Sequence, residues 1–218
     1  MNEILFFGEI ICVFSSVLLA KKFFDKAGLL AWIPIATILA DLTVAKSITL
    51  FGMDTTLGNV LFASVFLATD ILTECYGAKE ARKGIFMGLF GMIMFVLCSQ
   101  IAVYYLPSSL DYVNKQMTEL FTIDLRIFLV SSILYFIANI SDVFLYEKIR
   151  EKTGQKKIWL RNNISTITCN CLENFLFMFF GFYGMFSFND CMYMALTVSF
   201  FEAIIGLCDT PFLYLALK

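Results

Sequence analysis

The chain has 218 residues, of which 60% are hydrophobic and only 16% are charged. Soluble domains carry about 25% charged residues, so this composition excludes an ordinary soluble domain and predicts an integral membrane protein. The net charge of −2 provides no basic surface for nucleic acid, and the lack of histidine removes the commonest general base and metal ligand.

Seven apolar runs follow one another along the chain, each near the roughly 20 residues that one membrane crossing needs. We therefore predict an all-α, polytopic helical bundle of about seven transmembrane helices. The gaps between the runs are too short to hold another domain, so residues 1–218 are expected to form a single integral membrane domain. The first run lacks a basic segment before it and is expected to be a retained helix. The runs cover residues 4–24, 29–50, 58–77, 84–106, 125–147, 164–186 and 192–217.

Basic and acidic gaps alternate between the runs. Most of the 16 basic residues lie in the first, third and fifth gaps, and Lys218 ends the chain. The charged residues of the other three gaps are mainly aspartate and glutamate. Because basic gaps tend to stay in the cytoplasm, this alternation predicts an N-terminus outside and a C-terminus in the cytoplasm.

Two carboxylates lie one helical turn apart in the third run. Asp70 and Glu74 are at i and i+4, so a helix places both on one face. Acids inside a membrane are costly and usually mark the path of a substrate or an ion. Glu74 lies close to the next basic gap and also fits a solvated helix end paired with Arg82. Asp70 lies deeper and is the stronger candidate for function.

A polar stripe runs along the sixth run. Thr166, Asn170 and Glu173 recur at helical spacing with Phe177, and Asn174 follows Glu173 directly. Hydroxyl and amide groups can simply join helices. The glutamate among them favours contact with a ligand.

Other acids inside the runs outnumber the basic groups near them. Lys46 shares the second run with Asp41, but a helix would place the two about 140° apart, so we do not expect them to pair. Unpaired intramembrane acids must be protonated, hydrated or matched by a ligand, which favours a proton-coupled or cation-accepting site. The further acids are Glu9, Asp142, Glu202 and Asp209.

Three stretches together resemble the queuosine precursor transporter family, also called the vitamin uptake transporter family. They are FLATDILTECYG at 66–77, ISDVFLYEKIR at 140–150, and WLRNNIST at 159–166 with ENFLF at 173–177. The segments 44–46 and 209–212 (DTPF) also fit. In order and spacing, the similarity covers about residues 37–217.

This resemblance implies a multi-pass importer of the inner membrane that carries 7-deazaguanine bases for tRNA modification. Its substrates would be 7-cyano-7-deazaguanine, 7-aminomethyl-7-deazaguanine or queuine. A six-helix core is common in the family, so the first run would be an extra N-terminal helix. The implied transport is secondary, by alternating access, and compatible with proton coupling. The expected binding residues are Asp70, Glu74, Asn170, Glu173 and Asn174, supported by Lys46, Asp142, Thr166 and Asp209.

Three positions depart from the family pattern. Members often have asparagine or a small residue near Asp41, aspartate near Glu173 and lysine near Glu202. The last difference replaces a cation by an acid, which could favour an amine-bearing base over the neutral nitrile.

Two other functions stay open on the sequence. The chain could be the substrate-binding subunit of an energy-coupling-factor transporter, because it has no Walker A loop and would need another chain to supply ATP. An intramembrane enzyme has little support, because paired acids are weak evidence without a nucleophile or metal-ligand motif. We expect no cofactor, no metal and no nucleic-acid partner. Besides the lipid bilayer, a homo-oligomer or the energy-coupling module would be the protein partner.

Overall fold

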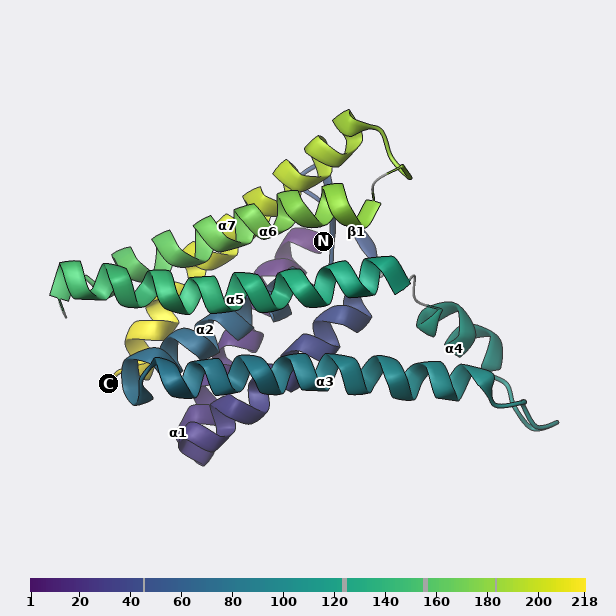
Figure 1. Cartoon of the computed structure of the whole chain (residues 1–218), viewed down its shortest axis with the longest axis horizontal. Helices are drawn as coiled ribbons and strands as arrows, with labels where there is room; N and C mark the ends of the chain where they lie inside the picture. Colours follow the sequence, from purple (N-terminus) through teal and green to yellow (C-terminus); the bar gives the residue numbers. More distant parts are fainter. Residues whose placement is uncertain (45, 123–124, 155–156, 183) are drawn as a thin grey trace.

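The computed structural model describes the whole chain except residues 45, 123–124, 155–156 and 183, and it confirms the predicted helical bundle (Figure 1). Six of its helices are long and apolar enough to cross a membrane among the described residues. The elements are α1 (Asn2–Thr43), β1 (Ser47–Leu50), β2 (Met53–Thr56), α2 (Asn59–Tyr76), α3 (Ala78–Tyr104), α4 (Asn114–Phe121), α5 (Leu125–Thr153), α6 (Ile158–Phe182) and α7 (Phe188–Ala216).

Helix α1 is folded in two at Asp25, whose φ of 53° interrupts the helical backbone. A straight helix of its 42 residues would be about 63 Å long. Instead the Asn2 side chain, at the start, donates to the Thr49 carbonyl oxygen at 3.1 Å, just beyond the end of the helix. The first two apolar runs are therefore two helical segments that lie side by side and meet at the bend. Asp25 accepts a hydrogen bond from the Tyr76 hydroxyl, which holds the bend against α2.

A short β-hairpin, rather than helix, ends the second apolar run. Strands β1 and β2 pair antiparallel, and the turn residues Phe51 and Gly52 have φ values of 50° and 78°. Two central residues with positive φ are typical of the tight turn that suits the twist of a hairpin. Our prediction of helix to residue 50 was wrong here, because a short apolar run cannot distinguish a strand from a helix.

Helix α2 is the central helix of the bundle and contacts α1, α3, α5 and α7. Residues 59–60 and 63–73 are all buried, although they include several polar side chains. Small residues such as Ala63, Ser64 and Ala68 let the neighbouring helices approach closely. Ser64 also accepts a hydrogen bond from the indole N–H of Trp32 at 2.9 Å, which ties α2 to the second half of α1.

The basic connections gather at one end of the bundle, on the left in Figure 1. Lys26 pairs with Glu80 at 3.4 Å, and Arg82 of α3 pairs with Glu147 near the end of α5 at 2.9 Å, so the bend of α1, the start of α3 and the end of α5 meet there. Lys21 donates to the carbonyl oxygen of Ala216, which brings the C-terminus to the same place. We call this the basic end. The N-terminus, the β-hairpin, α4 and the connection between α6 and α7 lie toward the other end, which we call the acidic end.

Candidate functional site

A cavity of about 430 Å³ opens between the helices in the part of the bundle toward the acidic end. Its wall is formed by the second half of α1, the end of β2, the starts of α2 and α5, the part of α3 around Phe95, the end of α4 and the inward faces of α6 and α7. A pocket of this size is within the range that holds small molecules. The polar lining residues are Asp41, Thr56, Asn59, Thr122, Ser131, Glu173, Asn174 and Glu202.

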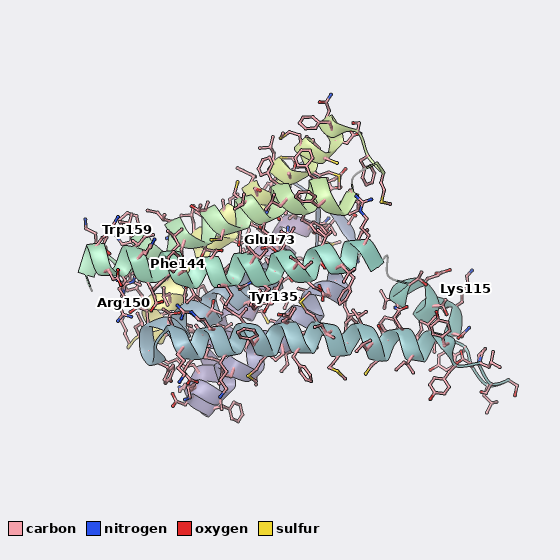
Figure 2. The ribbon with its side chains drawn as sticks, viewed as in Figure 1. Lys115, Tyr135, Phe144, Arg150, Trp159 and Glu173 are labelled. Atoms are coloured by element: carbon pink, nitrogen blue, oxygen red, sulfur yellow. The ribbon has the colours of Figure 1, made fainter. Side chains whose placement is uncertain are left out.

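Three carboxylates face this cavity, and the described residues that line it include no lysine or arginine. The Asn174 amide donates to Glu202 Oε2 at 2.6 Å, so this carboxylate is held in place. Glu173 Oε2 is shielded from solvent and has no hydrogen-bond partner among the described residues. Figure 2 shows Glu173 about midway along the molecule, between α5 and α6. The unpaired oxygen is therefore available to a ligand that donates hydrogen bonds.

Aromatic rings form much of the remaining wall. Phe62 of α2, Phe128 of α5 and Phe177 of α6 line the cavity together with Phe95, Phe121 and Phe182. Phe177 and Phe182 pack edge to face with ring centroids 5.6 Å apart. Rings of this kind provide flat apolar surfaces on which a planar heterocycle can stack. The cavity thus combines aromatic surfaces with hydrogen-bond acceptors.

Asp70 lies outside the cavity, deeper in the bundle. It is 11 positions along α2 from Asn59, which corresponds to about 16 Å toward the basic end. The side chain is completely buried, and neither carboxylate oxygen has a hydrogen-bond partner among the described residues. Asp142, Asp209, Glu74 and Arg161 are charged groups close enough to act on Asp70.

These three acids, with Asn162 and Thr166, make up what we call the inner cluster. The Thr166 hydroxyl donates to Asp142 Oδ1 at 3.3 Å, which joins α6 to α5. The Asn162 amide donates to Asp209 Oδ1 at 2.6 Å, which joins α6 to α7. All five side chains are buried. Four helices thus converge on a polar centre within an apolar bundle.

A third polar group, centred on Glu74, closes the bundle at the basic end. Glu74 Oε1 accepts a hydrogen bond from the Tyr146 hydroxyl at 2.8 Å and forms an ion pair with the fully buried Arg161. Arg161 also donates to the Gly154 carbonyl oxygen at 2.8 Å. Arg150 lies 3.8 Å from the other oxygen of Glu74. We call this set the basic-end network.

Helix α6 connects the three groups. Asn162, Thr166, Asn170 and Asn174 follow one another at intervals of four residues and lie on one face. Arg161, which directly precedes this series, belongs to the basic-end network, and Asn174, at the end of the series, lines the cavity. Polar groups therefore extend through the bundle from one end almost to the other.

Comparison with known proteins places this arrangement in a family. The family model described as "Putative vitamin uptake transporter" matches residues 56–216. A protein of Bacillus subtilis (strain 168) named "Probable queuosine precursor transporter" is 32% identical over 206 residues, which cover 94% of this chain and 90% of the relative. The chain belongs to the queuosine precursor transporter family, also called the vitamin uptake transporter family. As a family member it is a multi-pass transporter of the bacterial inner membrane, and not an enzyme.

Two further relatives match shorter parts of the chain. The "Queuosine precursor transporter" of Escherichia coli (strain K12) is 27% identical over 145 residues, which cover 64% of this chain and 61% of the relative. A protein of Haemophilus influenzae named "Probable queuosine precursor transporter" is 28% identical over 134 residues, covering 61% of this chain and 54% of the relative. No solved structure matches the chain.

The structure divides the predicted site residues of the transporter among separate places. Glu173 and Asn174 line the cavity, whereas Asp70, Asp142, Asp209 and Thr166 form the inner cluster and Glu74 belongs to the basic-end network. Asn170 is buried on α6 between the cavity and the inner cluster. Their roles in binding stay a prediction.

We expected Lys46 to lie inside a transmembrane helix, and this prediction was wrong. Lys46 is exposed in the connection between α1 and the β-hairpin, because α1 ends at Thr43. There it lines a smaller cavity of about 120 Å³ together with Glu9 and Asn59. Asn59 belongs to the walls of both cavities.

The sequence-based site omitted several residues that the structure brings into position. Arg161 was assigned to a basic gap, but α6 begins at Ile158 and buries it completely. Glu202 and Asp41 were recognised as intramembrane acids without a place in the site, and both line the cavity. The regular spacing of Asn162 with Thr166 and Asn170 would have indicated that the polar stripe begins earlier.

Proposed function

We propose that this transporter imports queuosine precursors, the 7-deazaguanine bases used for tRNA modification, and that they bind in the cavity around Glu173. The relatives named as queuosine precursor transporters support the substrate class. The observation that carries the site is a cavity walled by phenylalanines and lined by Glu173, whose Oε2 is buried without a hydrogen-bond partner among the described residues.

The chemistry of the base suits these walls. A 7-deazaguanine presents two adjacent N–H donors on one edge, and a carboxylate can accept both. Glu173 would take this edge, and the phenylalanine rings would stack on the flat base. Polar side chains such as Asn59 and Asn174 would bind the remaining polar atoms.

Among these bases, the charge of the cavity favours those that carry an amine. Asp41, Glu173 and Glu202 line it, and no lysine or arginine does so in the part of the chain that the structure describes. An ammonium group would interact favourably with a carboxylate that the base edge leaves free, whereas a neutral nitrile would not. The preferred substrates would therefore be 7-aminomethyl-7-deazaguanine or queuine.

Transport would follow alternating access between the two ends of the bundle. The cavity lies toward the acidic end, and the basic-end network joins α2, α5 and α6 beyond the inner cluster. In this state the route toward the basic end is closed. Release on that side would require these helices to separate, so that the polar face of α6 becomes accessible.

The test is binding and uptake by the purified full chain. Thermal-shift titration with the three bases should show binding, with guanosine as a control of different shape. Proteoliposomes containing only this chain should then take up the bound base. Binding without uptake, restored by co-reconstitution of an energy-coupling module with ATP, would instead establish the energy-coupling-factor subunit. Binding of none of the three bases would refute the proposed substrate class.

A further inference from the structure

We propose that the inner cluster carries the proton that drives import, at a site separate from the one that binds the base. Asp70 would be the principal proton carrier, with Asp142 and Asp209 sharing the site. This inference rests on the proposed import function and adds its energy source.

The first observation is that the inner cluster is separate from the cavity, because none of its three acids is among the residues that line the cavity. On α6, Glu173 of the cavity wall and Thr166 of the inner cluster are seven positions apart, or about 10 Å along the helix. A base held by Glu173 therefore leaves the inner acids free for another ligand.

The second observation is an excess of hydrogen-bond acceptors. Both oxygens of Asp70, one oxygen of Asp142 and one of Asp209 are buried without a partner among the described residues. The Asn162 amide points its nitrogen at Asp209, and its oxygen is also buried and unpaired. A buried acceptor without a donor is costly, and protonation turns a carboxylate into a donor. Protons are thus the ligand that this cluster lacks.

Positive charge does not replace those protons. Arg161 of α6 is the cation that acts on Asp70, and it is already paired with Glu74. Glu74 of α2, Tyr146 of α5 and Cys169 of α6 are the other titratable groups near Asp70, besides the two aspartates. The guanidinium that acts on Asp70 is therefore shared with Glu74, and one positive charge stands against several buried acids among the described residues.

The geometry favours a proton over a metal cation. A metal ion needs several ligands converging on one point, and no three acidic or cysteine side chains among the described residues do so. A proton needs only one oxygen. In the cycle, a proton entering from the acidic end would form an O–H bond on an inner carboxylate, and the same bond would break when the basic end opens.

The experiment separates binding from coupling by replacing Asp70 with its neutral isostere. The variant Asp70→Asn is compared with the wild type and with Asp54→Asn, which changes an exposed residue of β2. Each protein is tested for base binding by thermal shift. In proteoliposomes, each is then tested for accumulation driven by an inward proton gradient, and for exchange of labelled against unlabelled base without a gradient.

We expect Asp70→Asn to bind the base within about twofold of the wild type and to keep exchange, because asparagine resembles the protonated acid. Gradient-driven accumulation should fall at least about tenfold. Asp54→Asn should behave as the wild type. If Asp70→Asn fails to fold, Asp142→Asn and Asp70→Glu take its place, and only the glutamate variant should retain accumulation.

Three results would overturn the inference. Loss of base binding in Asp70→Asn would make Asp70 a substrate ligand, and undiminished accumulation would remove it from coupling. Wild-type accumulation that follows a sodium gradient and ignores the proton gradient would assign a metal ion. If the wild type binds no base at all, the proposed function fails instead, and the binding measurement reveals this separately.

Discussion

Glu173 is the residue on which the proposed base site depends most directly. Glu173 lines a largely aromatic cavity and has one oxygen without a hydrogen-bond partner among the described residues, so we expect its removal to affect affinity more than folding. Its neighbour Glu202 differs, because Asn174 already bonds one of its oxygens. Replacing each of the two acids is therefore expected to have a different effect on binding.

Replacement of Glu173 by glutamine should weaken binding of every 7-deazaguanine base by at least about tenfold. The amide keeps the shape of the side chain but presents a donor where the base needs a second acceptor, which leaves a buried polar group unpaired. Isothermal titration with the purified protein measures the change. Glu119→Gln, on the exposed surface of α4, is the matched control and should bind normally.

Replacement of Glu202 by glutamine should reduce discrimination among bases. The variant loses a negative charge but keeps an acceptor for the Asn174 amide. Affinity for the aminomethyl base should fall, while affinity for the nitrile should stay within about twofold. Competition binding gives the ratio directly, and an unchanged ratio would show that Glu202 does not select for an amine.

Among the helices, α2, α5 and α6 are joined most directly at the basic end. Arg161 is placed there by the start of α6, and Glu74 by the end of α2. Buried ion pairs of this kind stabilise little relative to apolar packing, but loss of one partner leaves an unpaired charge. The packing of these three helices at the basic end therefore depends on both partners of the ion pair being present.

Replacement of Arg161 by methionine should destabilise the transporter by about 3 kcal/mol, because Glu74 loses its buried cation. The double variant Arg161→Met with Glu74→Gln should recover much of this loss. Thermal unfolding in detergent measures both. Equal destabilisation of the single and double variants would mean that packing of the arginine, rather than its charge, is what matters.

The whole molecule is polarised along the direction of the helices. The basic connections lie together at the basic end, where ion pairs link them, and the cavity lies toward the acidic end. Figure 2 shows this separation, with Arg150 and Trp159 at one end and Lys115 of α4 at the other. Which end faces the cytoplasm stays a prediction from charge.

That orientation can be tested by labelling. In a chain whose seven cysteines are replaced, Ser108→Cys reports the acidic end and Lys152→Cys the basic end. A membrane-impermeant thiol reagent should label only the first in intact cells, and both after permeabilisation. The opposite labelling pattern would show that the acidic end faces the cytoplasm, so that the cavity would lie toward the cytoplasmic side.

The class of protein, the succession of apolar segments and the alternation of charge could all be predicted from the amino-acid sequence. These properties follow from composition and local order, because hydropathy and charge act on each segment separately. The sequence also identified Glu173 and Asp70, since an acid in an apolar helix is conspicuous wherever the helix packs.

Which of these acids lie together became clear only from the packing of the helices. Asp70 and Glu173 were expected to share a site, but α2 and α6 carry them to different depths, and only Glu173 reaches the cavity. The bend at Asp25 and the strands that follow α1 likewise depend on contacts with distant residues, such as Tyr76 and Asn2. The physical reason is that depth, partners and shielding arise from packing between helices, which local sequence does not specify.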